Sequence, residues 1–445
     1  MPEGAVREGA RFPKEVHYAT RVTEEERDAA SMEQVRDVAL RAKEAAGALR
    51  SASTATKNAA LGALARRLRA QTSEIVAENA RDVEEAKGAG LSAAMLDRLA
   101  LDGRRIEAIA RSVEEVIALP DPVGRVEGLV RRPSGITVGR MHVPIGVIAM
   151  IYESRPNVTI DAATLCLKSG NAAVLRGGSE AARSNAILAR CVRDSLQEAR
   201  LPEASVALVA SQSRAATRAL LGLVGLVDVV IPRGGPGLIR FVAEHARVPV
   251  IAHYHGVCHL YVDAGADLER AIAMVLDGKS RPGVCNALEA LLVHGDVASE
   301  LLGRLDAALS ERGIEARAEP CAKSSMPHAV AARDDDFGQE FLAKILAVKV
   351  VDDLDAAIAH VARFGSGHTE AIATSSYEHA QRWLREVDAS CVLVNASTRF
   401  NDGGELGLGA ELGTATSKLH AYGPMGLEEL TTRKWIVYGN GEVRG

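Results

Sequence analysis

Short apolar runs alternate with helical segments from residue 143 onward, and this alternation restricts the fold more than any other feature of the chain. The runs lie at residues 147–151, 172–175, 206–210, 227–231 and 250–252, and then at 259–263, 288–293, 347–351, 371–374 and 392–394. Apolar strands separated by helices are typical of a parallel sheet covered on both faces. Because the series restarts near residue 259, the sequence predicts two α/β domains.

The remaining segments predict a leader, a helical region and an arm. Residues 1–31 are polar and lack periodicity, so we expect a flexible leader, with Met32 as a candidate native start. Residues 32–119 are rich in Ala, Leu, Arg and Glu, and the apolar residues of 106–117 share one helical face. Residues 122–140 predict a hairpin or extended arm, and residues 430–438 predict a final strand.

Composition and charge exclude several classes of function. The net charge of −5 gives no basic field for nucleic acid or for an anionic membrane. The six cysteines form no C-x-x-C pair, which indicates reduced thiols. The residues from His253 to His259 offer metal-ligating side chains, but no second cluster lies at a recognised spacing, so no metal site is predicted. We expect a cytoplasmic protein without a membrane segment that binds a small molecule.

Cys285 is the strongest candidate for a chemical role. It follows the polar turn 278–284, which contains Lys279 and Arg281, and it precedes an apolar run that predicts a strand. Basic neighbours favour the thiolate, which is the nucleophilic form of cysteine. The alternative is a cysteine buried as a small hydrophobic residue.

Two strand ends carry residues suited to an anionic ligand. Gly234 and Gly235 follow one strand and precede a helix, a geometry that offers free N–H groups to a phosphate or a nicotinamide cofactor. Arg176 ends another strand, at the edge where ligands of α/β proteins bind. The alternatives are a simple tight turn and a surface arginine. No G-x-G-x-x-G or P-loop motif follows a strand in the required way.

Two polar segments predict a ligand cleft. Residues 152–157 place four polar side chains directly after a buried strand, where they need partners. Residues 395–402 follow the strand at 392–394 and gather amide, hydroxyl and guanidinium groups suited to a zwitterionic substrate, with a plain polar loop as the alternative. The candidate residues in this second segment are Asn395, Ser397, Thr398 and Arg399.

Together these residues resemble the aldehyde dehydrogenase superfamily, and within it the γ-glutamyl phosphate reductase family. The resemblance covers the chain from about residue 32 to its end. The motifs that carry it are VPIGVI at 143–148, YESRPNVT at 152–159, SGNA at 169–172, LRGGSE at 175–180, RPGVCN at 281–286, VNASTRF at 394–400 and GLG at 407–409.

The resemblance implies an α/β fold of two parallel-sheet domains and a β oligomerisation arm. It places a cofactor-binding domain at 32–121 and 141–254, a catalytic domain at 255–400, the arm at 122–140 and 425–445, and a return segment to the cofactor domain at 401–424. It makes Cys285 the nucleophile and puts NADPH or NADP beside Arg176, Gly177, Gly178, Ser179, Gly234, Gly235 and Glu340, with Arg176 and Ser179 on the adenosine side and Glu340 at the nicotinamide ribose. Gly177 and Gly178 stand where superfamily members often carry bulkier residues.

Two departures from the superfamily pattern bear on the chemistry. The segment that matches the asparagine-bearing oxyanion motif reads YESRP here, so Ser154 or Asn157 would supply that donor. Residues 255–259 match the segment in which hydrolytic members keep a glutamate that activates water, and they contain no carboxylate. An enzyme without that base should protect its thioester from water.

The resemblance implies NADPH-dependent reduction of L-glutamyl 5-phosphate to L-glutamate 5-semialdehyde, through a thioester on Cys285, in proline synthesis. Arg155, Arg281 or Arg399 would hold the substrate anions. The expected partners are the substrate, further copies of the chain and, transiently, a glutamate 5-kinase. The rival functions are a hydrolytic semialdehyde dehydrogenase, a cysteine acyltransferase or hydrolase without a redox cofactor, and a non-catalytic scaffold.

Overall fold

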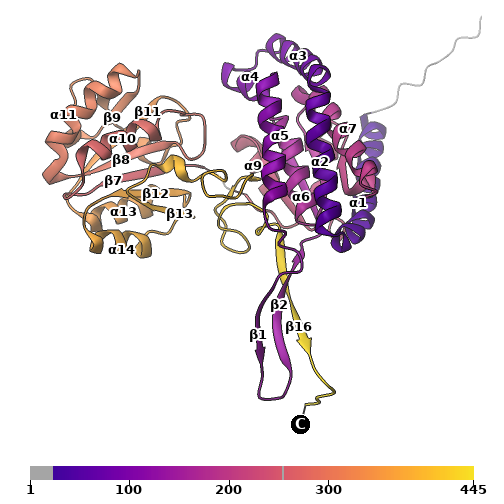
Figure 1. Cartoon of the computed structure of the whole chain (residues 1–445). Coiled ribbons are helices and arrows are strands. Elements are labelled where there is room, and N and C mark those ends of the chain that lie inside the picture. The colour runs from indigo at the N-terminus through magenta and orange to yellow at the C-terminus, as the bar shows by residue number, and fades with distance from the viewer. Residues whose placement is uncertain (1–23, 253–254, 445) are drawn as a thin grey trace, which may run out of the picture.

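The computed structural model describes residues 24–252 and 255–444, which form two α/β units and a protruding arm (Figure 1). The predicted leader at 1–23 and residues His253 and Tyr254 of the candidate metal cluster lie outside the described residues. We name the two units the four-strand unit and the seven-strand unit after their sheets.

The four-strand unit holds a parallel sheet with the order β5-β4-β3-β6. Its strands are β3 (Val147–Tyr152), β4 (Ala172–Gly177), β5 (Val206–Leu208) and β6 (Val229–Arg233). Its helices are α1 (Glu24–Ser51), α2 (Thr54–Ala70), α3 (Thr72–Gly88), α4 (Ala93–Leu99), α5 (Gly103–Ala118), α6 (Asn157–Lys168), α7 (Ala182–Glu198), α8 (Arg214–Leu221) and α9 (Pro236–His245), with a 3₁₀ turn at Ser179–Ala181. All six residues of β3 are buried, which fits its unbroken apolar sequence.

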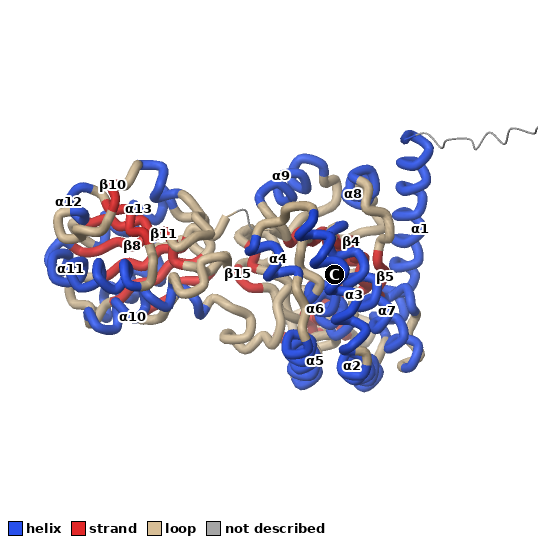
Figure 2. Tube along the Cα trace, turned by 90° about the horizontal axis from the view of Figure 1, so that it is seen from above, coloured by secondary structure: helices blue, strands red, loops and turns tan. Residues whose placement is uncertain are grey.

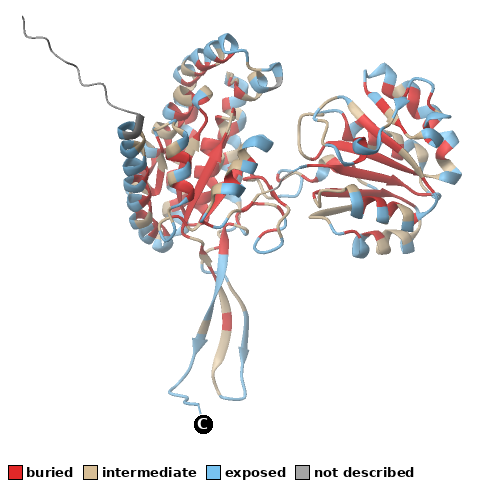
Figure 3. Ribbon diagram, turned by 180° about the vertical axis from the view of Figure 1, so that it is seen from behind, coloured by how far each residue is buried: buried red, intermediate tan, exposed pale blue. Residues whose placement is uncertain are grey.

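The seven-strand unit holds a parallel sheet with the order β10-β9-β11-β8-β7-β12-β13. Its strands are β7 (Cys258–Val262), β8 (Leu288–His294), β9 (Glu315–Ala318), β10 (Val330–Ala331), β11 (Ile345–Val351), β12 (Thr369–Ala373) and β13 (Cys391–Val394). Its helices are α10 (Leu268–Gly278), α11 (Gly295–Glu311), α12 (Pro320–Lys323), α13 (Leu354–Phe364) and α14 (Tyr377–Glu386). The central strands β3, β7 and β12 are buried along their whole length (Figure 3).

The arm is an antiparallel sheet with the order β1-β2-β16. Its strands are β1 (Val126–Arg131), β2 (Thr137–Pro144) and β16 (Thr431–Tyr438), so the predicted hairpin and the predicted final strand meet in one sheet. Much of the arm is exposed, and the guanidinium of Arg140 lies 5.0 Å from the centre of the Trp435 ring. Two short strands, β14 (Thr414–Ala415) and β15 (Gly423–Pro424), pair in the segment that leads back to it.

Four details differ from the sequence prediction. Helix α1 begins at Glu24, before the expected start at Met32, because residues 24–31 have good helix propensity although they lack an apolar face. Residues 141–144 belong to the arm, because β2 continues to Pro144. The apolar run at 250–252 forms only an isolated bridge, between Val230 and Val250. Strands β9 and β10 were not predicted, since runs of four and two residues carry too little pattern.

The chain returns from the seven-strand unit to the four-strand unit through residues 401–430. Seven apolar side chains of this segment are buried in the core of the four-strand unit: Ala410, Leu412, Ala415, Ala421, Met425, Leu427 and Leu430. Seen from above, loops fill the region between the two units (Figure 2). The carboxyl ends of β3, β4 and β6 carry residues 153–155, 178–180 and 234–235, whereas the turn that holds Cys285 precedes β8, at the amino-terminal end of the other sheet.

Candidate active site

Cys285 lies between α10 and β8 and is partly exposed. Burial raises the pKa of its thiol, and the carboxylates of Glu411 and Glu340 act in the same direction. The guanidinium groups of Arg233 and Arg155 oppose this effect. The resting residue is therefore a thiol, and the cations are the groups that favour its conversion into the attacking thiolate.

Hydrogen bonds within the seven-strand unit fix the turn of Cys285. The amide Nδ2 of Asn286 donates to the carbonyl oxygens of Arg399, at 3.2 Å, and Asn401, at 3.0 Å. The guanidinium of Arg399 donates to Oδ1 of the same amide. The thiol of Cys258 donates to the carbonyl oxygen of Cys285 at 3.1 Å. The side chain of Asn286 and the thiol of Cys258 thus hold the backbone around Cys285 in place.

Four guanidinium groups lie near one another beside Cys285. Burial, together with the charges of Arg233, Arg98 and Arg281, lowers the pKa of Arg155 to about 10, and the charge of Cys285 opposes this effect. Like charges at one site repel each other unless an anion joins them, so this arrangement suits a substrate with several negative charges. Arg155 and Arg281 were predicted from the sequence, whereas Arg98 and Arg233 were not.

The two arginines that sequence reasoning missed come from the four-strand unit. Arg98 lies on α4 and donates to the carbonyl oxygen of Gly283 at 2.7 Å, so it joins that unit to the turn of Cys285. Arg233 is the last residue of β6. Arg233 precedes Gly234 and Gly235 at a strand end, and this position could have marked it as a ligand-binding residue. The sequence around Arg98 contains no such mark.

The two candidate oxyanion donors have different surroundings. The hydroxyl and the backbone N–H of Ser154 both donate to Oε1 of Glu180, and Ser154 has a φ of 48°. Asn157, the first residue of α6, donates from Nδ2 to Asp161 at 2.9 Å. Burial raises the pKa of Asp161 to about 6, and the hydrogen bond from Asn157 opposes that rise. Of the two side chains, the hydroxyl is already engaged and the amide is held in a fixed orientation with one N–H to spare.

Glu340 lies beside the backbone of the nucleophile. Its side chain is 12% exposed, and burial raises the pKa of its carboxyl group. The backbone N–H of Gly256 is the strongest of the influences that lower this pKa. Gly256 packs so closely on the carbonyl group of Cys285 that a Cβ at this position would collide with it. Glu340, Gly256 and Cys285 therefore form one contiguous group.

A cavity of about 640 Å³ opens at the carboxyl ends of β3, β4 and β6. Its lining includes Glu153, Arg176, Gln212, Arg214, Thr217, Gly235, Leu238, Arg240 and Phe241. Arg176 donates from Nη2 to the carbonyl oxygen of Gln212 at 3.0 Å, while its Nε is buried without a hydrogen-bond partner among the described residues. A phosphate-bearing nicotinamide cofactor fits this cavity, since it offers anionic groups to the arginines and an acceptor to that unpaired N–H.

The predicted cofactor glycines fall into two pairs. Side chains at Gly177 and Gly178 would collide with Asn185 and Glu180, so close packing within the protein accounts for both glycines. Gly235 caps α9 and donates its N–H to Glu153 at 3.1 Å.

The other two predicted positions on this side are Gly234 and Ser179. Gly234 has the Glu153 carboxylate close to its Cα. Ser179 is exposed at the edge of a neighbouring cavity of about 390 Å³, together with Glu153 and Glu180. Glu153 therefore contacts the start of α9 and also lines the cavity at whose edge Ser179 lies.

The segment predicted to hold a zwitterion is divided between the two ends of the sheet. Asn395 is paired through both its amide atoms with the backbone of Thr374, at the carboxyl ends of β12 and β13. Ser397 and Thr398 are buried, and Ser397 accepts the N–H of Arg399 at 3.3 Å. Only Arg399, through Asn286, contacts the residues that adjoin Cys285.

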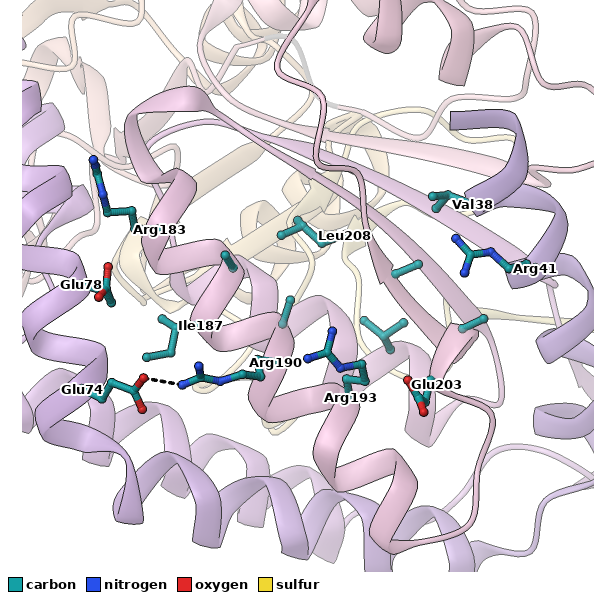
Figure 4. A pocket seen from close by; sticks show the side chains of 15 residues that line it. Val38, Arg41, Glu74, Glu78, Arg183, Ile187, Arg190, Arg193, Glu203 and Leu208 are labelled. Carbon is teal, nitrogen blue, oxygen red and sulfur yellow. Dashed lines mark hydrogen bonds and ion pairs between the residues drawn. The ribbon is translucent and has the colours of Figure 1, made fainter. Parts of the chain in front are cut away.

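A further cavity, of about 680 Å³, lies among α1, α3, α7 and β5 (Figure 4). It is on the side of the four-strand unit that faces away from the seven-strand unit (Figure 1). Arg190 in its wall is paired with Glu74 at 2.6 Å, and Arg183 is paired with Glu85. We assign it no part in the chemistry at Cys285.

Within residues 24–252 and 255–444, no helix is long and apolar enough to cross a membrane. In the same part of the chain, no three His, Cys, Asp or Glu side chains are grouped so that they could hold a metal ion.

Comparison with known proteins agrees with this geometry. Residues 10–325 match the sequence profile of the aldehyde dehydrogenase family. The gamma-glutamyl phosphate reductase of Sorangium cellulosum is 62% identical over 416 residues, which cover 92% of this chain and 97% of that protein. The crystal structure of the gamma-glutamyl phosphate reductase of Thermotoga maritima is 43% identical, has a TM-score of 0.90, and matches over 93% of this chain and 100% of that one.

A more distant structure shares the fold alone. It is a glyceraldehyde-3-phosphate dehydrogenase of Methanocaldococcus jannaschii complexed with NADP, which is 14% identical, with a TM-score of 0.67 over 92% of this chain and 95% of that one. The family uses a nicotinamide cofactor, which fits the cavity at Arg176. From its sequence, its fold and its relatives, the chain belongs to the aldehyde dehydrogenase family of oxidoreductases and, within it, to the gamma-glutamyl phosphate reductases.

Proposed function

We propose that this enzyme reduces L-glutamyl 5-phosphate to L-glutamate 5-semialdehyde with release of phosphate, as a step of proline synthesis. The observation that carries the proposal is the group of four arginines, Arg98, Arg155, Arg233 and Arg281, beside the partly exposed thiol of Cys285. An amino acid with an acyl phosphate carries anions at both ends, and bidentate guanidinium contacts suit both carboxylate and phosphate.

In this proposal Cys285 attacks the acyl carbon, the C–O bond to phosphate breaks, and the glutamyl group stays on sulfur as a thioester. The backbone N–H of Cys285 and the amide of Asn157 stabilise the oxyanion that forms during the attack. Phosphate leaves as an anion that the arginines can accept, so the step needs no strong general acid. We favour Asn157 over Ser154 because the Ser154 hydroxyl already donates to Glu180.

The cofactor proposed for the cavity is NADPH, which supplies hydride to the acyl carbon held on Cys285. Arg176, Arg214 and Arg240 line that cavity and would bind the phosphates. The carboxylates of Glu153 and Glu244 line the same cavity, so the cations exceed the anions by one. This excess of positive charge favours a cofactor that carries an extra phosphate, which is why we propose NADPH over NADH.

The second candidate is a hydrolytic semialdehyde dehydrogenase. It is favoured by the carboxylates of Glu340 and Glu411, which lie close enough to act on the thiol of Cys285. In such an enzyme one of them would take the place of the missing glutamate as the base that activates water.

One experiment separates the two candidates. NADP⁺ reduction is followed with pyrroline-5-carboxylate, the cyclised semialdehyde, in the presence and absence of inorganic phosphate. The proposed function predicts strict dependence on phosphate, because phosphate must attack the thioester to release the product. Turnover at an equal rate without phosphate would establish the hydrolytic enzyme instead.

We also propose that the enzyme assembles into a homo-oligomer and works in the cytoplasm. The arm supports assembly, because Leu129, Trp435, Val437 and Tyr438 are exposed on an isolated sheet. All six cysteines are free thiols, as a reducing compartment requires. Transient contact with a glutamate 5-kinase stays a prediction.

A further inference from the structure

A buried ion pair lies under the turn of the nucleophile. Lys279 ends α10, Glu289 lies on β8, and their Nζ and Oε2 atoms are 2.5 Å apart. Both side chains are at most 1% exposed. Burial lowers the pKa of Lys279 and raises that of Glu289 to about 7, so each charge costs free energy at this position. Such a pair adds little stability compared with apolar residues, and its presence calls for another explanation.

The pair acts on the turn that follows Glu340. The backbone N–H groups of Phe341 and Leu342 lower the pKa of Glu289 and so favour its ionised form. Its Oε1 is buried without a hydrogen-bond partner among the described residues, which leaves these N–H groups as the nearby donors that act on it. The ring of Phe341 lies 5.9 Å from Nζ of Lys279. Its centre is also 5.2 Å from the guanidinium of Arg317, so two cations border one ring.

This turn is strained. Leu342 has a φ of 52°, a left-handed conformation that a leucine adopts at a cost. Such strain persists only where the surroundings hold the backbone in place. Two buried charged side chains contribute to holding it. Glu289 attracts the backbone N–H groups of Phe341 and Leu342, and Lys279 lies near the ring of Phe341.

Glu340 connects the turn to the reacting groups. Its carboxylate interacts with the N–H of Gly256, which packs on Cys285, and it also contributes to the electrostatic environment of Lys279. We infer that Lys279 and Glu289 are positioning residues that hold Glu340 where it binds the nicotinamide ribose of the cofactor. This inference rests on the proposed function, since it needs a nicotinamide cofactor at Glu340.

The test is the affinity for NADPH of the full-length protein, measured from the change in NADPH fluorescence without turnover. Glu289→Gln should raise the Kd about tenfold, because the turn loses its charged acceptor. In a Glu340→Gln background the same substitution should change the Kd less than about twofold, because Glu289 acts through Glu340. Phe341→Leu keeps the ion pair, removes the ring between the two cations, and should raise the Kd about threefold.

The matched control is a second buried ion pair, between Lys57 on α2 and Asp121, with side chains 1% and 8% exposed and an N–O distance of 2.5 Å. Lys57→Met and Lys279→Met should both lower the melting temperature. Lys279→Met should also raise the Kd for NADPH, whereas Lys57→Met should leave the Kd at the wild-type value.

Three outcomes would overturn the inference while leaving the proposed function intact. The first is a wild-type Kd for NADPH in folded Glu289→Gln and Phe341→Leu. The second is that Glu289→Gln raises the Kd in the Glu340→Gln background by the same factor as in the wild type. The third is that Lys57→Met raises the Kd as much as Lys279→Met does. If the wild-type protein bound no NADPH at all, the proposed function itself would fail, and the inference with it.

Discussion

The two sheets of this molecule place their functional residues at opposite ends of their strands. In the four-strand unit, Arg176, Arg233 and the glycines before α9 lie at or just beyond the carboxyl ends, where α/β proteins usually bind ligands. In the seven-strand unit, Cys285 and Cys258 lie at the amino-terminal ends of β8 and β7. The usual rule for parallel sheets therefore locates the proposed cofactor cavity and gives the wrong end of the sheet for the proposed nucleophile, Cys285.

The two regions also differ in how their residues are held. The proposed cofactor cavity is built from strand ends and from the start of α9, so its shape follows from regular structure. The turn of Cys285 depends on side chains from distant segments, such as Asn286, Cys258 and Arg98. Substitutions near Cys285 should therefore affect the rate of the chemical step, and those in the cavity should affect binding.

The largest effect is expected for Cys285→Ala. Without the sulfur no thioester forms, so kcat should fall by at least about 10⁴-fold, whereas the Kd for NADPH should stay near the wild-type value. Steady-state rates and a fluorescence titration on the same preparation measure both quantities. Substantial activity in this variant would show that Cys285 of the seven-strand unit is not the nucleophile.

Gly256→Ala should be next in size. Its Cβ would collide with the carbonyl group of Cys285, and a displacement of the nucleophile by about 1 Å costs roughly 10²-fold in kcat. The control is Gly303→Ala on α11, where a Cβ has open space and should only stabilise the helix. Equal kcat values in the two variants would show that the turn of Cys285 tolerates movement.

In the cavity of the four-strand unit, Arg214→Ala should weaken the preference for NADPH over NADH about tenfold, because the cavity loses one cation that would bind phosphate. The ratio of kcat/KM for the two cofactors measures this preference. Arg193→Ala, in the cavity shown in Figure 4, is the control and should leave the ratio unchanged. If both variants behaved alike, the 640 Å³ cavity would lose its assignment.

The smallest effect concerns the ionisation of Cys285. Arg233 favours the thiolate, so Arg233→Gln should raise the pKa of the thiol further and move the alkylation profile to higher pH by less than about one unit. Below that pKa the thiol is protonated and alkylation is slow, and above it the rate levels off. The rate of iodoacetamide labelling against pH gives the curve, with Arg193→Ala again as control. A shift to lower pH would mean that Arg233 does not face the sulfur.

The sequence was sufficient to predict the parts of the fold and site that depend on local patterns. The apolar runs gave nine of the eleven strands in the two parallel sheets and missed only the short β9 and β10, while the run at 250–252 formed no strand. The arm was visible from its Pro and Gly turns. Cys285 was predicted from its place between a basic turn and a strand, together with the family resemblance of the segment 281–286, since the position alone also fits a cysteine buried as a small hydrophobic residue. Arg155 followed from polar residues that interrupt a buried segment.

The rest depended on contacts that no local pattern encodes. Arg98 reaches the turn of Cys285 from a helix 185 residues earlier in the chain, and nothing near it in the sequence marks it. Asn395 belongs to a polar segment that looked like a substrate site, yet its amide closes a turn with Thr374. Close packing around Gly177, where a Cβ would collide with Asn185, is likewise absent from the local pattern, and the predicted contact of Gly177 and Gly178 with the cofactor stays a prediction.

The central claim is that Cys285 carries the glutamyl group as a thioester, and mass spectrometry tests it most directly. The enzyme is mixed with NADP⁺ and pyrroline-5-carboxylate without phosphate, quenched in acid and measured as intact protein and as peptides. The account predicts a mass increase of one glutamyl group on the peptide that contains Cys285, formed together with one equivalent of NADPH and removed when phosphate is added before the quench. NADPH formation with no added mass on that peptide would contradict it.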